Sequence, residues 1–584
     1  MGDFNNIETR NELADFLNIP RKLLSYVLYV KGVDNSYTSF EIQKKNGGIR
    51  KINAPSLELK SIQKKLAQAL YKHKEKKQGK RNNISHAFEK KKGIISNAKV
   101  HRNKKYVLNM DLENYFESFH FGRVRGYFIK NNAFLLPTEV ATVIAQLSCY
   151  EGKIPQGSPS SPVITNLICE ILDRRIAKIA KQYKLHYTRY ADDLTFSTNE
   201  KNFLNLQTEF LEKISTEIIN AGFKINSKKT RLQLRDSRQM VTGLTVNKKI
   251  NVSREYYKET RAMAHELYKK GFFDINGEPG TLKQLEGRLA FINQLTKENN
   301  KLIDDLPHYK NPRFSSRERQ YQRFLFYKYF FANHKPLIVT EGKTDVLYLK
   351  SALKSLYKEY PDLITRKNDG SFEFKVSFLK KTKRLRYFLG IYPDGASALN
   401  NIFDFFNKNQ PLLNHLGYLK KESGTSPKNP VILMFDNELK SGKDRPIGKF
   451  LKHASISDKK STVERDYMLN INDNLYLLTV PLIDGKLECD IEDLFENKTL
   501  LHEVSGKTFS KKDNFDPSKH YGKDRFSKYI WNNYNDVDFK KFKPLLDNLV
   551  YITSEYTKDS ISTVDASEAK NIDKSSTGKV PVEV

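Results

Sequence analysis

The stretch that decides the fold is Leu185-His-Tyr-Thr-Arg-Tyr-Ala-Asp-Asp-Leu-Thr-Phe-Ser197, which carries Asp192 and Asp193 side by side. Apolar and polar residues alternate on both sides of the two acids, a pattern typical of a β-hairpin with the acids at its turn. Adjacent carboxylates repel each other, and a hard cation such as Mg²⁺ relieves that repulsion. Because an isolated Asp-Asp pair is more often a solvated turn, further acids must decide its role.

A third acid, Asp111, lies in the strand-like run Tyr106-Val-Leu-Asn-Met-Asp111 upstream of the hairpin. Three carboxylates suit two-metal nucleotidyl transfer. In that chemistry one ion lowers the pKa of the attacking hydroxyl, and the other neutralises the leaving pyrophosphate. We therefore expect Asp111, Asp192 and Asp193 to be catalytic and to bind Mg²⁺ as a two-metal site.

Together with the loop Ile154-Pro-Gln-Gly-Ser-Pro-Ser-Ser-Pro162, these acids resemble the palm of a reverse transcriptase. Two further segments, Asn97-Ala-Lys-Val-His101 and the triplet Val241-Thr-Gly243, resemble elements of bacterial retron reverse transcriptases, which are similar to group II intron enzymes. The segments follow the family's order within residues 1–325. The resemblance implies a right-hand polymerase with fingers, palm and thumb.

The resemblance also implies roles for residues around the palm. Phe116, five residues after Asp111, would lie beneath the sugar and exclude a 2′-hydroxyl, with simple core packing as the alternative. The residues expected at the nucleotide are Arg50, Lys51, Phe116, Gln156, Gly157, Tyr190 and Lys228, with Lys229 beside them; for the four cations, general nucleic-acid contact is equally open. The residues expected to handle RNA are Asn97, His101, Val241, Thr242 and Gly243, although a lone histidine is more often structural.

Retron enzymes are implied to start DNA synthesis at a 2′-hydroxyl of a structured noncoding RNA that serves as template and primer. The expected partners are therefore this RNA, dNTPs and the branched RNA-linked DNA product (msDNA). The sequence shows no separate RNase H constellation, so a host RNase H is expected to remove the template.

Composition agrees with a nucleic-acid partner. The chain has 584 residues, 39% of them hydrophobic, and a formal net charge of +32, which favours a polyanionic partner over a merely solvated basic surface. The three cysteines form neither a disulfide framework nor a zinc spacing. Without a signal pattern or an apolar run of membrane-spanning length, we expect a cytoplasmic protein with no membrane partner. The Lys-rich run 72–92 is expected to be an exposed loop.

The arrangement of apolar residues along the sequence changes after residue 335. Leu337-Ile-Val-Thr340 and Val431-Ile-Leu-Met-Phe435 are continuous apolar strands followed by Glu341 and by Asp436-Asn-Glu438. Such strands, alternating with helices, indicate a parallel sheet covered on both faces. Acids at their carboxyl ends fall on the edge where α/β folds bind ligands.

Glu341-Gly-Lys-Thr-Asp345 and Asp436-Asn-Glu438 resemble the two signatures of the TOPRIM fold, found in topoisomerases, primases and nucleases of the overcoming-lysogenisation-defect type. Glu438 departs from the usual Asp-x-Asp but keeps an oxygen ligand. The resemblance implies Glu341 as a catalytic residue and Glu341, Asp436 and Glu438 as ligands for Mg²⁺ or Mn²⁺. The supporting residues are Gly342, Lys343, Asp345, Gly395 and Glu492; Glu492 and Asp493 are equally typical of a helix cap.

The fold expected is thus multidomain α+β and α/β, a right-hand polymerase followed by a TOPRIM Rossmann-like parallel-sheet domain. The expected boundaries are fingers and palm 1–245, helical thumb 246–325, TOPRIM domain 326–505, a C-terminal extension 506–558 and a disordered tail 559–584.

The leading functional hypothesis joins both sites in a retron reverse transcriptase fused to a TOPRIM nuclease, a toxic effector in antiphage defence. Its target is open among RNA (tRNA included) and DNA, and a homo-oligomer is open too. The alternatives are a mobile-element enzyme whose TOPRIM domain processes cDNA, and a TOPRIM domain that binds nucleic acid without cleaving it.

Overall fold

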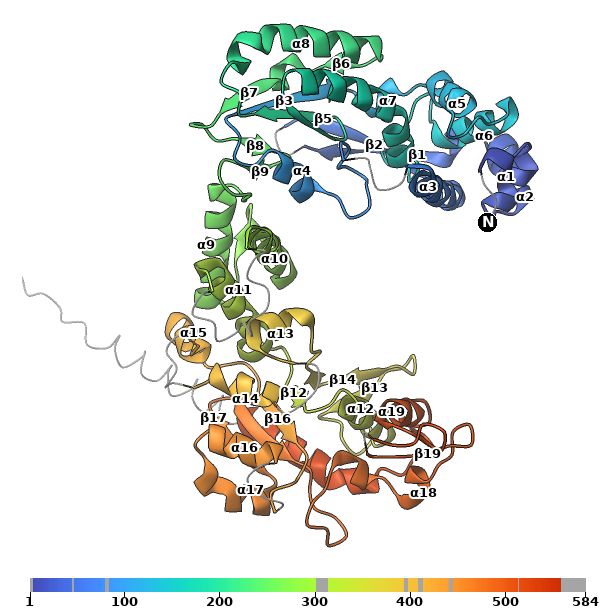
Figure 1. Ribbon diagram of the computed structural model, residues 1–584. Coiled ribbons are helices and arrows are strands. Elements are labelled where there is room, and N and C mark those ends of the chain that lie inside the picture. Colours follow the sequence, from blue (N-terminus) through green and yellow to red (C-terminus); the bar gives the residue numbers. More distant parts are fainter. Residues whose placement is uncertain are drawn as a thin grey trace, which may run out of the picture. The chain divides into compact units, whose positions relative to one another are not determined.

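The computed structural model describes residues 4–44, 47–78, 83–300, 314–392, 397–407, 413–440, 445–512 and 514–557. Two compact units divide the chain, Met1–Tyr256 and Tyr257–Val584, and each is described by itself (Figure 1). Gly395 and the predicted tail 559–584 lie outside the described residues. In the described part of the chain, no helix combines the length and the apolar character that crossing a membrane requires.

The first unit begins with helices and a two-stranded hairpin that is largely exposed. Strands β1 (Tyr37–Gln43) and β2 (Ile49–Pro55) pair in antiparallel register. The helices are α1 (Arg10–Phe16), α2 (Arg21–Ser25), α3 (Leu57–Gln78), α4 (Ile94–Val100), α5 (Phe121–Lys130) and α6 (Thr138–Ser148). The predicted loop over 72–92 is wrong in its first part, because α3 continues to Gln78. Its Lys and Gln residues are good helix formers, so charge alone does not end the helix.

The palm is a five-stranded sheet. Strand β3 (Tyr106–Glu113) lies between β5 (Asp193–Thr198) and, on its other side, β6 (Lys224–Ile225) and β7 (Arg231–Leu234), and β4 (His186–Tyr190) pairs with β5 at the edge. The predicted hairpin is confirmed. Helices α7 (Ser161–Gln182) and α8 (Phe203–Asn220) cover one face (Figure 1). Buried residues of α7 and α8 share one core with alternate residues of β3 to β5.

The second unit begins with helical elements. These are α9 (Arg254–Lys270), α10 (Leu282–Asn299) and α11 (Ser316–Phe326), with the short strands β10 (Asp274–Ile275) and β11 (Glu278–Pro279) between α9 and α10. Helix α11 continues without a break into a π-helical turn, Tyr327–Phe331. The expected junction between residues 325 and 326 therefore falls inside a continuous helical run.

A five-stranded sheet forms the centre of the second unit. Its order is β15 (Ser377–Phe378), β12 (Leu337–Thr340), β16 (Val431–Phe435), β18 (Leu475–Thr479) and β17 (Met468–Asn472), and all strands but β17 run parallel. Alternate residues of the strands enter two separate cores. Both faces are thus buried, as the continuous apolar runs predict.

Different helices cover the two faces of this sheet. One core contains Leu337 and Leu433 together with residues of α9, α10, α11, α13 (Lys383–Leu389), α14 (Ser397–Asp404), α15 (His415–Ser423), α16 (Pro446–His453) and α17 (Lys460–Asp466). The other contains Ile338 and Ile432 with α12 (Asp345–Ser355), α19 (Lys523–Asn532) and residues 537–556. The helices of the expected thumb therefore share a hydrophobic core with the C-terminal sheet.

Candidate functional site

Three acids meet where β3 and the β4–β5 hairpin end. Asp111 of β3 lies directly opposite Asp193 of β5 in the strand register. Ala191 and Asp192 form the tight turn, with Ala191 in the left-handed region at φ 56°. The Leu112 amide donates to the Asp192 carbonyl over 3.1 Å, which ties the turn to β3. The predicted grouping of the three acids at one end of the palm sheet is therefore what the fold produces.

The electrostatics of this group are those of carboxylates held close together. Burial, reinforced by Asp192 and Asp111, raises the pKa of Asp193 to about 7. Burial is also the main cause that raises the pKa of Asp192. The ammonium of Lys229 lies 2.9 Å from each carboxylate oxygen of Asp111. A cation thus already offsets part of the negative charge.

Oxygen donors of this kind fit a divalent metal ion, since Mg²⁺ prefers carboxylate oxygens. Across the described residues, no group of three or more His, Cys, Asp or Glu side chains is already arranged around a metal position. The three acids would have to converge on the ions, with Lys229 releasing Asp111. Burial, with repulsion among the acids as a smaller cause, raises the pKa values of Asp192 and Asp193, and bound cations would favour their charged forms.

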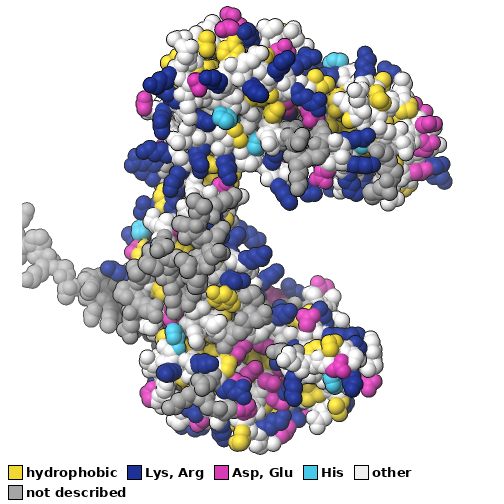
Figure 2. Space-filling model, viewed as in Figure 1, with side chains coloured by type: hydrophobic (Ala, Val, Ile, Leu, Met, Phe, Trp, Pro, Cys, Tyr) yellow, Lys and Arg dark blue, Asp and Glu magenta, His cyan; other side chains and the backbone are white. Residues whose placement is uncertain are grey.

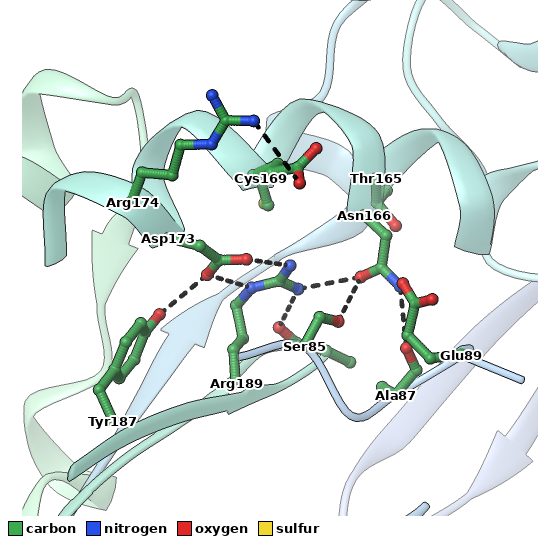
Figure 3. A network of polar contacts seen from close by, with 12 residues as sticks. Ser85, Ala87, Glu89, Thr165, Asn166, Cys169, Asp173, Arg174, Tyr187 and Arg189 are labelled. Carbon is green, nitrogen blue, oxygen red and sulfur yellow. Dashed lines mark hydrogen bonds and ion pairs between the residues drawn. The ribbon is translucent and has the colours of Figure 1, made fainter. Parts of the chain in front are cut away.

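A buried ion pair supports the catalytic hairpin from behind. Arg189 of β4 is fully buried and forms two hydrogen bonds of 2.8 Å with Asp173 of α7. Its Nη1 also donates to the carbonyl of Ala191 over 3.3 Å and to Asn166 Oδ1 over 3.2 Å. Figure 3 shows the guanidinium between Asp173 and Asn166, beneath the helix that carries both. Arg189 therefore fixes the turn that carries Asp192 to the core of the palm.

The residues expected at the nucleotide lie in different surroundings. Arg50 is exposed on β2, and its charge offsets a small part of the rise that burial causes in the pKa of Asp192. Lys51, with its side chain on the opposite face of β2, lines a cavity of about 220 Å³ together with Gln156. Phe116 is half-buried, and its ring lies 5.3 Å from that of Tyr115.

Gly157, Lys228 and Tyr190 were also expected at the nucleotide, and the structure shows what each of them contacts. Gly157 has φ 127°, and a Cβ there would lie 2.5 Å from the Asn53 carbonyl oxygen, so the close approach it permits is to β2. Next to it, the Asn53 amide donates to the Gln156 carbonyl over 2.8 Å. Lys228 is exposed, and its neighbour Lys229 is the one bound to Asp111. Tyr190 is half-buried, with a pKa raised by burial and by Asp193.

The two retron-like segments lie against each other. Asn97, in the middle of α4, and His101, which caps the end of that helix, are fully buried. The imidazole bonds Ser197 Oγ at 2.8 Å and Thr188 Oγ1 at 2.7 Å, so it connects α4 to β5 and β4. Burial lowers the pKa of His101 to about 3, which keeps the ring neutral. Neither side chain is exposed for direct contact with RNA, so any influence on RNA acts through the position of α4.

The Val241-Thr242-Gly243 triplet forms the turn between β8 (Met240–Val241) and β9 (Leu244–Thr245). Thr242 has φ 45° and Gly243 has φ 80°, as a tight hairpin turn requires. Val241 is buried, whereas Gly243 is exposed. The Thr242 hydroxyl lies 3.5 Å from the carbonyl of Ile94, at the start of α4. The tip of this hairpin is thus accessible while its base packs on α4.

A second acidic group lies at the carboxyl edge of the C-terminal sheet. The Asp436 amide, after β16, donates to Glu341 Oε1, after β12, over 3.3 Å. Burial raises the pKa of Glu341 to about 7, and Asp345 and Glu438 add to the shift. Burial, with Asp345 and Glu341 close by, raises the pKa of Asp436 well above its usual range. In Figure 2 acidic side chains gather on this part of the second unit.

The supporting residues divide into those that face the acids and those that do not. The Gly342 amide donates to Asp345 over 2.9 Å, which shapes the loop after β12. Glu492 is fully buried, has a pKa raised to about 7 mainly by burial, and accepts a hydrogen bond of 3.1 Å from Lys523. Lys343 is exposed and pairs with Asp524 at 3.4 Å.

Asp493 and Glu438, two acids considered as metal ligands, already have other partners in the structure. Asp493 faces away from the group, because it bonds Lys486 and Lys511 and caps a short helix with Asp490. Its role as a helix cap is the one the structure supports. Glu438 is half-buried and pairs with Arg445 at 3.3 Å.

Sequence reasoning missed three residues of these sites. Arg189 immediately precedes the Tyr190-Ala-Asp-Asp193 segment, and the alternation of β4 would have pointed its side chain toward α7. Asp490 precedes Glu492 in the same short run and raises its pKa. Lys523 lies far along the chain, on α19, and no local pattern points to it.

Comparisons with known proteins agree with the palm geometry. The family described as reverse transcriptase (RNA-dependent DNA polymerase) matches residues 42–259. The chain is 34% identical over 297 residues to the retron Ec86 reverse transcriptase of Escherichia coli, covering 50% of this chain and 87% of that protein. It is 33% identical over 278 residues to the retron Mx65 reverse transcriptase of Myxococcus xanthus, covering 45% and 62%.

Among solved structures, a telomerase from Candida albicans is similar with a TM-score of 0.29 and 12% identity, over 50% of this chain and 58% of that one. Reverse transcriptases use Mg²⁺ for catalysis, and the donor set of the palm is suited to it. The identity with the retron enzymes, extending over most of the Ec86 protein, and the acids assembled at the end of β3 lead to one conclusion. The chain belongs to the retron reverse transcriptases, a family of RNA-directed DNA polymerases.

Proposed function

We propose that this protein makes a branched RNA-linked single-stranded DNA from a structured noncoding RNA, and that its C-terminal sheet carries a TOPRIM nuclease that acts in antiphage defence. The observation that supports the second part is the meeting of Glu341 with Asp436 across two parallel strands. Burial and neighbouring acids raise both pKa values. Clustered carboxylates are costly without a cation, which favours a metal-dependent site over a passive surface.

In the polymerase, Asp111, Asp192 and Asp193 would hold Mg²⁺, which supplies activation of the attacking hydroxyl and charge neutralisation at the pyrophosphate. Arg50 and Lys229 bring positive charge to the same acids. The half-buried ring of Phe116 is suited to lie beneath the deoxyribose. Catalysis of this kind depends on positioning and electrostatics more than on covalent chemistry, so the rigid hairpin is part of the machinery.

In the nuclease, Glu341, Asp436 and Glu438 would bind Mg²⁺ or Mn²⁺, which supplies Lewis-acid activation of the phosphodiester. Glu341 would serve either as a metal ligand or as the general base, and the second role suits its raised pKa, which burial brings to about 7. Glu492, held by Lys523, is a further oxygen donor beside Asp436. The target proposed is nucleic acid, either RNA, with tRNA included, or DNA.

The remaining partners follow from this proposal. They are dNTPs, the noncoding RNA, the branched DNA, a host RNase H for template removal, and a second copy of the chain if the protein forms a homo-oligomer. The alternative functions are a mobile-element enzyme whose TOPRIM domain processes cDNA, and a C-terminal domain that binds the branched DNA without cleaving nucleic acid.

The test separates the two sites genetically. Asp192→Asn is close in shape but removes one anion, and it should abolish the branched DNA while the chain stays folded. Glu341→Gln should leave the branched DNA intact and abolish both toxicity and protection against phage. The measurements are a gel for the branched DNA and a plaque count in the same strains. Full protection in the Glu341→Gln strain would exclude the nuclease and favour the binding domain.

A further inference from the structure

A cavity of about 770 Å³ lies between α3, α5 and α7, and none of the palm acids Asp111, Asp192 and Asp193 lines it. Its volume is in the range of ligand pockets. None of its lining residues is among those assigned above to metal, nucleotide or RNA. We call it the α3–α5–α7 pocket.

Positive charge dominates its lining. The cations are Lys74, Lys77, Arg123, Lys130, Arg174 and Arg175, and Glu170 is the carboxylate among the lining residues. Lys74 forms an ion pair with Glu89, outside the pocket. Arg175 likewise pairs with a carboxylate outside the lining, that of Glu217, at 3.6 Å. Four cations then remain against Glu170, which lies 3.7 Å from Arg174, so the pocket keeps an excess of three positive charges.

Arg123 is the central member of this group. Its guanidinium lies over the rings of Phe119 and Phe223, at 4.8 and 4.5 Å from their centroids. It donates to the Ser118 carbonyl over 3.4 Å and forms no ion pair with any residue that the structure describes. Burial lowers its pKa. A guanidinium partly removed from water without a counter-charge is costly, so an external anion would stabilise it.

The floor of the pocket is apolar. Tyr127, Phe134, Leu167 and Ile168 lie beneath it and are each at most 8% exposed, whereas Ile171 at the edge leaves 48% of its surface exposed and supplies most of the accessible apolar surface. A ligand that fits both the cationic lining and the apolar floor has a flat apolar face and carries anionic groups. Nucleotides have this combination, since bases stack on apolar and aromatic side chains while phosphates bind Arg and Lys. The polymerase activity already requires RNA as a partner.

We propose that the α3–α5–α7 pocket binds an unpaired nucleotide, with its base against the apolar floor and its phosphates on Arg123 and the surrounding cations. The nucleotide comes from an unpaired segment of the RNA or is a free nucleotide, which share this chemistry. In the RNA case the pocket is an anchor outside the polymerase active site, and it selects RNA that presents an unpaired base at this place.

The test uses two variants with the same loss of charge in the full-length protein. The pocket variant replaces four exposed cations with Gln: Lys77, Lys130, Arg174 and Arg175. The control variant replaces four exposed lysines of the same unit, outside the pocket, with Gln: Lys178, Lys181, Lys201 and Lys213. Equal thermal unfolding of both variants and the wild type confirms that each is folded.

The probe is a fluorescent single-stranded RNA, whose Kd is measured over a range of salt concentrations. For the pocket variant, the slope of log Kd against log salt should fall by about 0.7 for each phosphate that the protein no longer neutralises, hence by about 1.5 to 3 in all. The control variant should keep more of the wild-type slope than the pocket variant does. Equal slopes in the two variants would overturn the proposal.

A second measurement locates the ligand. RNA containing thiouridine should crosslink on irradiation to peptides that contain Tyr127 or Phe134, and Arg123→Gln should lose the crosslink more than Arg123→Lys. Competition by a nucleoside monophosphate at similar concentration would identify a free nucleotide as the source; no competition would identify the RNA. Displacement by polyglutamate, without any crosslink, would show an acidic peptide site and refute the nucleotide.

Discussion

Arg189→Met is the sharpest test of how the palm holds its catalytic turn. The substitution keeps a long apolar stem and removes the guanidinium, which leaves the carboxylate of Asp173 buried without its cation. Breaking a buried ion pair on one side typically costs about 3–5 kcal/mol of stability. We expect a loss in that range, because both side chains are almost completely inaccessible to water.

The double variant Arg189→Met/Asp173→Leu separates stability from position. It removes both charges, so most of the lost stability should return, apart from about 1 kcal/mol for the hydrogen bond that Tyr187 donates to Asp173. It cannot restore the bond from Arg189 to the Ala191 carbonyl. If that bond positions Asp192, losing it removes about 1 to 1.5 kcal/mol of stabilisation of the transition state. The rate of nucleotide addition then falls about five- to tenfold.

The assays are denaturant unfolding of the full chain, followed through the transition of the first unit, and single-turnover primer extension on a preformed RNA–DNA duplex. A loss of less than about 1 kcal/mol in the free energy of unfolding of Arg189→Met would show that Asp173 does not depend on Arg189 as its buried counter-charge. Extension at the wild-type rate by the double variant would show that the turn keeps its geometry without the tether.

Three further predictions concern single residues. Phe116→Val should raise ribonucleotide incorporation in primer extension at least tenfold relative to dNTPs; unchanged discrimination would make Phe116 a packing residue. Gly157→Ala should raise the KM for dNTPs several-fold and cost about 1–3 kcal/mol, because the new Cβ meets the Asn53 carbonyl at 2.5 Å; a normal KM and melting temperature would show that the strand can shift. In EDTA, the free energy of unfolding should fall as pH rises from about 4.5 to 7, by up to about 3 kcal/mol from Glu341 alone. The reason is that folding raises the pKa of Glu341 from 4.5 to about 7, so the folded state favours its protonated form. Glu341→Gln should flatten the dependence of stability on pH, and an unchanged dependence in thermal unfolding would assign the effect to other acids.

Local patterns predicted two kinds of element: strands with one apolar and one polar face, and strands that are apolar on both faces. Alternation around Asp192 gave the β-hairpin, and the runs Leu337–Thr340 and Val431–Phe435 gave parallel strands buried on both faces. The positions of the acids followed, because strand ends bring them to one edge. The extension of α3 to Gln78 was not predicted, because its lysines were assigned to a loop by charge, although lysine favours helices.

Interactions between distant segments were beyond such patterns. Arg189 meets Asp173, and Lys523 meets Glu492, only after the chain has folded. Asn97 and His101 were expected to handle RNA, yet tertiary packing buries them beneath the catalytic strands. Periodicity along the chain reports which face of an element is covered, but it does not report by which residue.

The core shared by the thumb helices and the C-terminal sheet has a mechanical consequence. Residues such as Leu267 of α9 and Leu289 of α10 belong to the same packed cluster as Leu433 of β16, and Glu286 of α10 pairs with Lys328 at 2.7 Å. A close-packed core moves as one body. If α9 to α11 form the thumb that grips a duplex, as the proposed function requires, any movement of these helices carries the acid-bearing edge of the sheet with it, because both belong to one packed core.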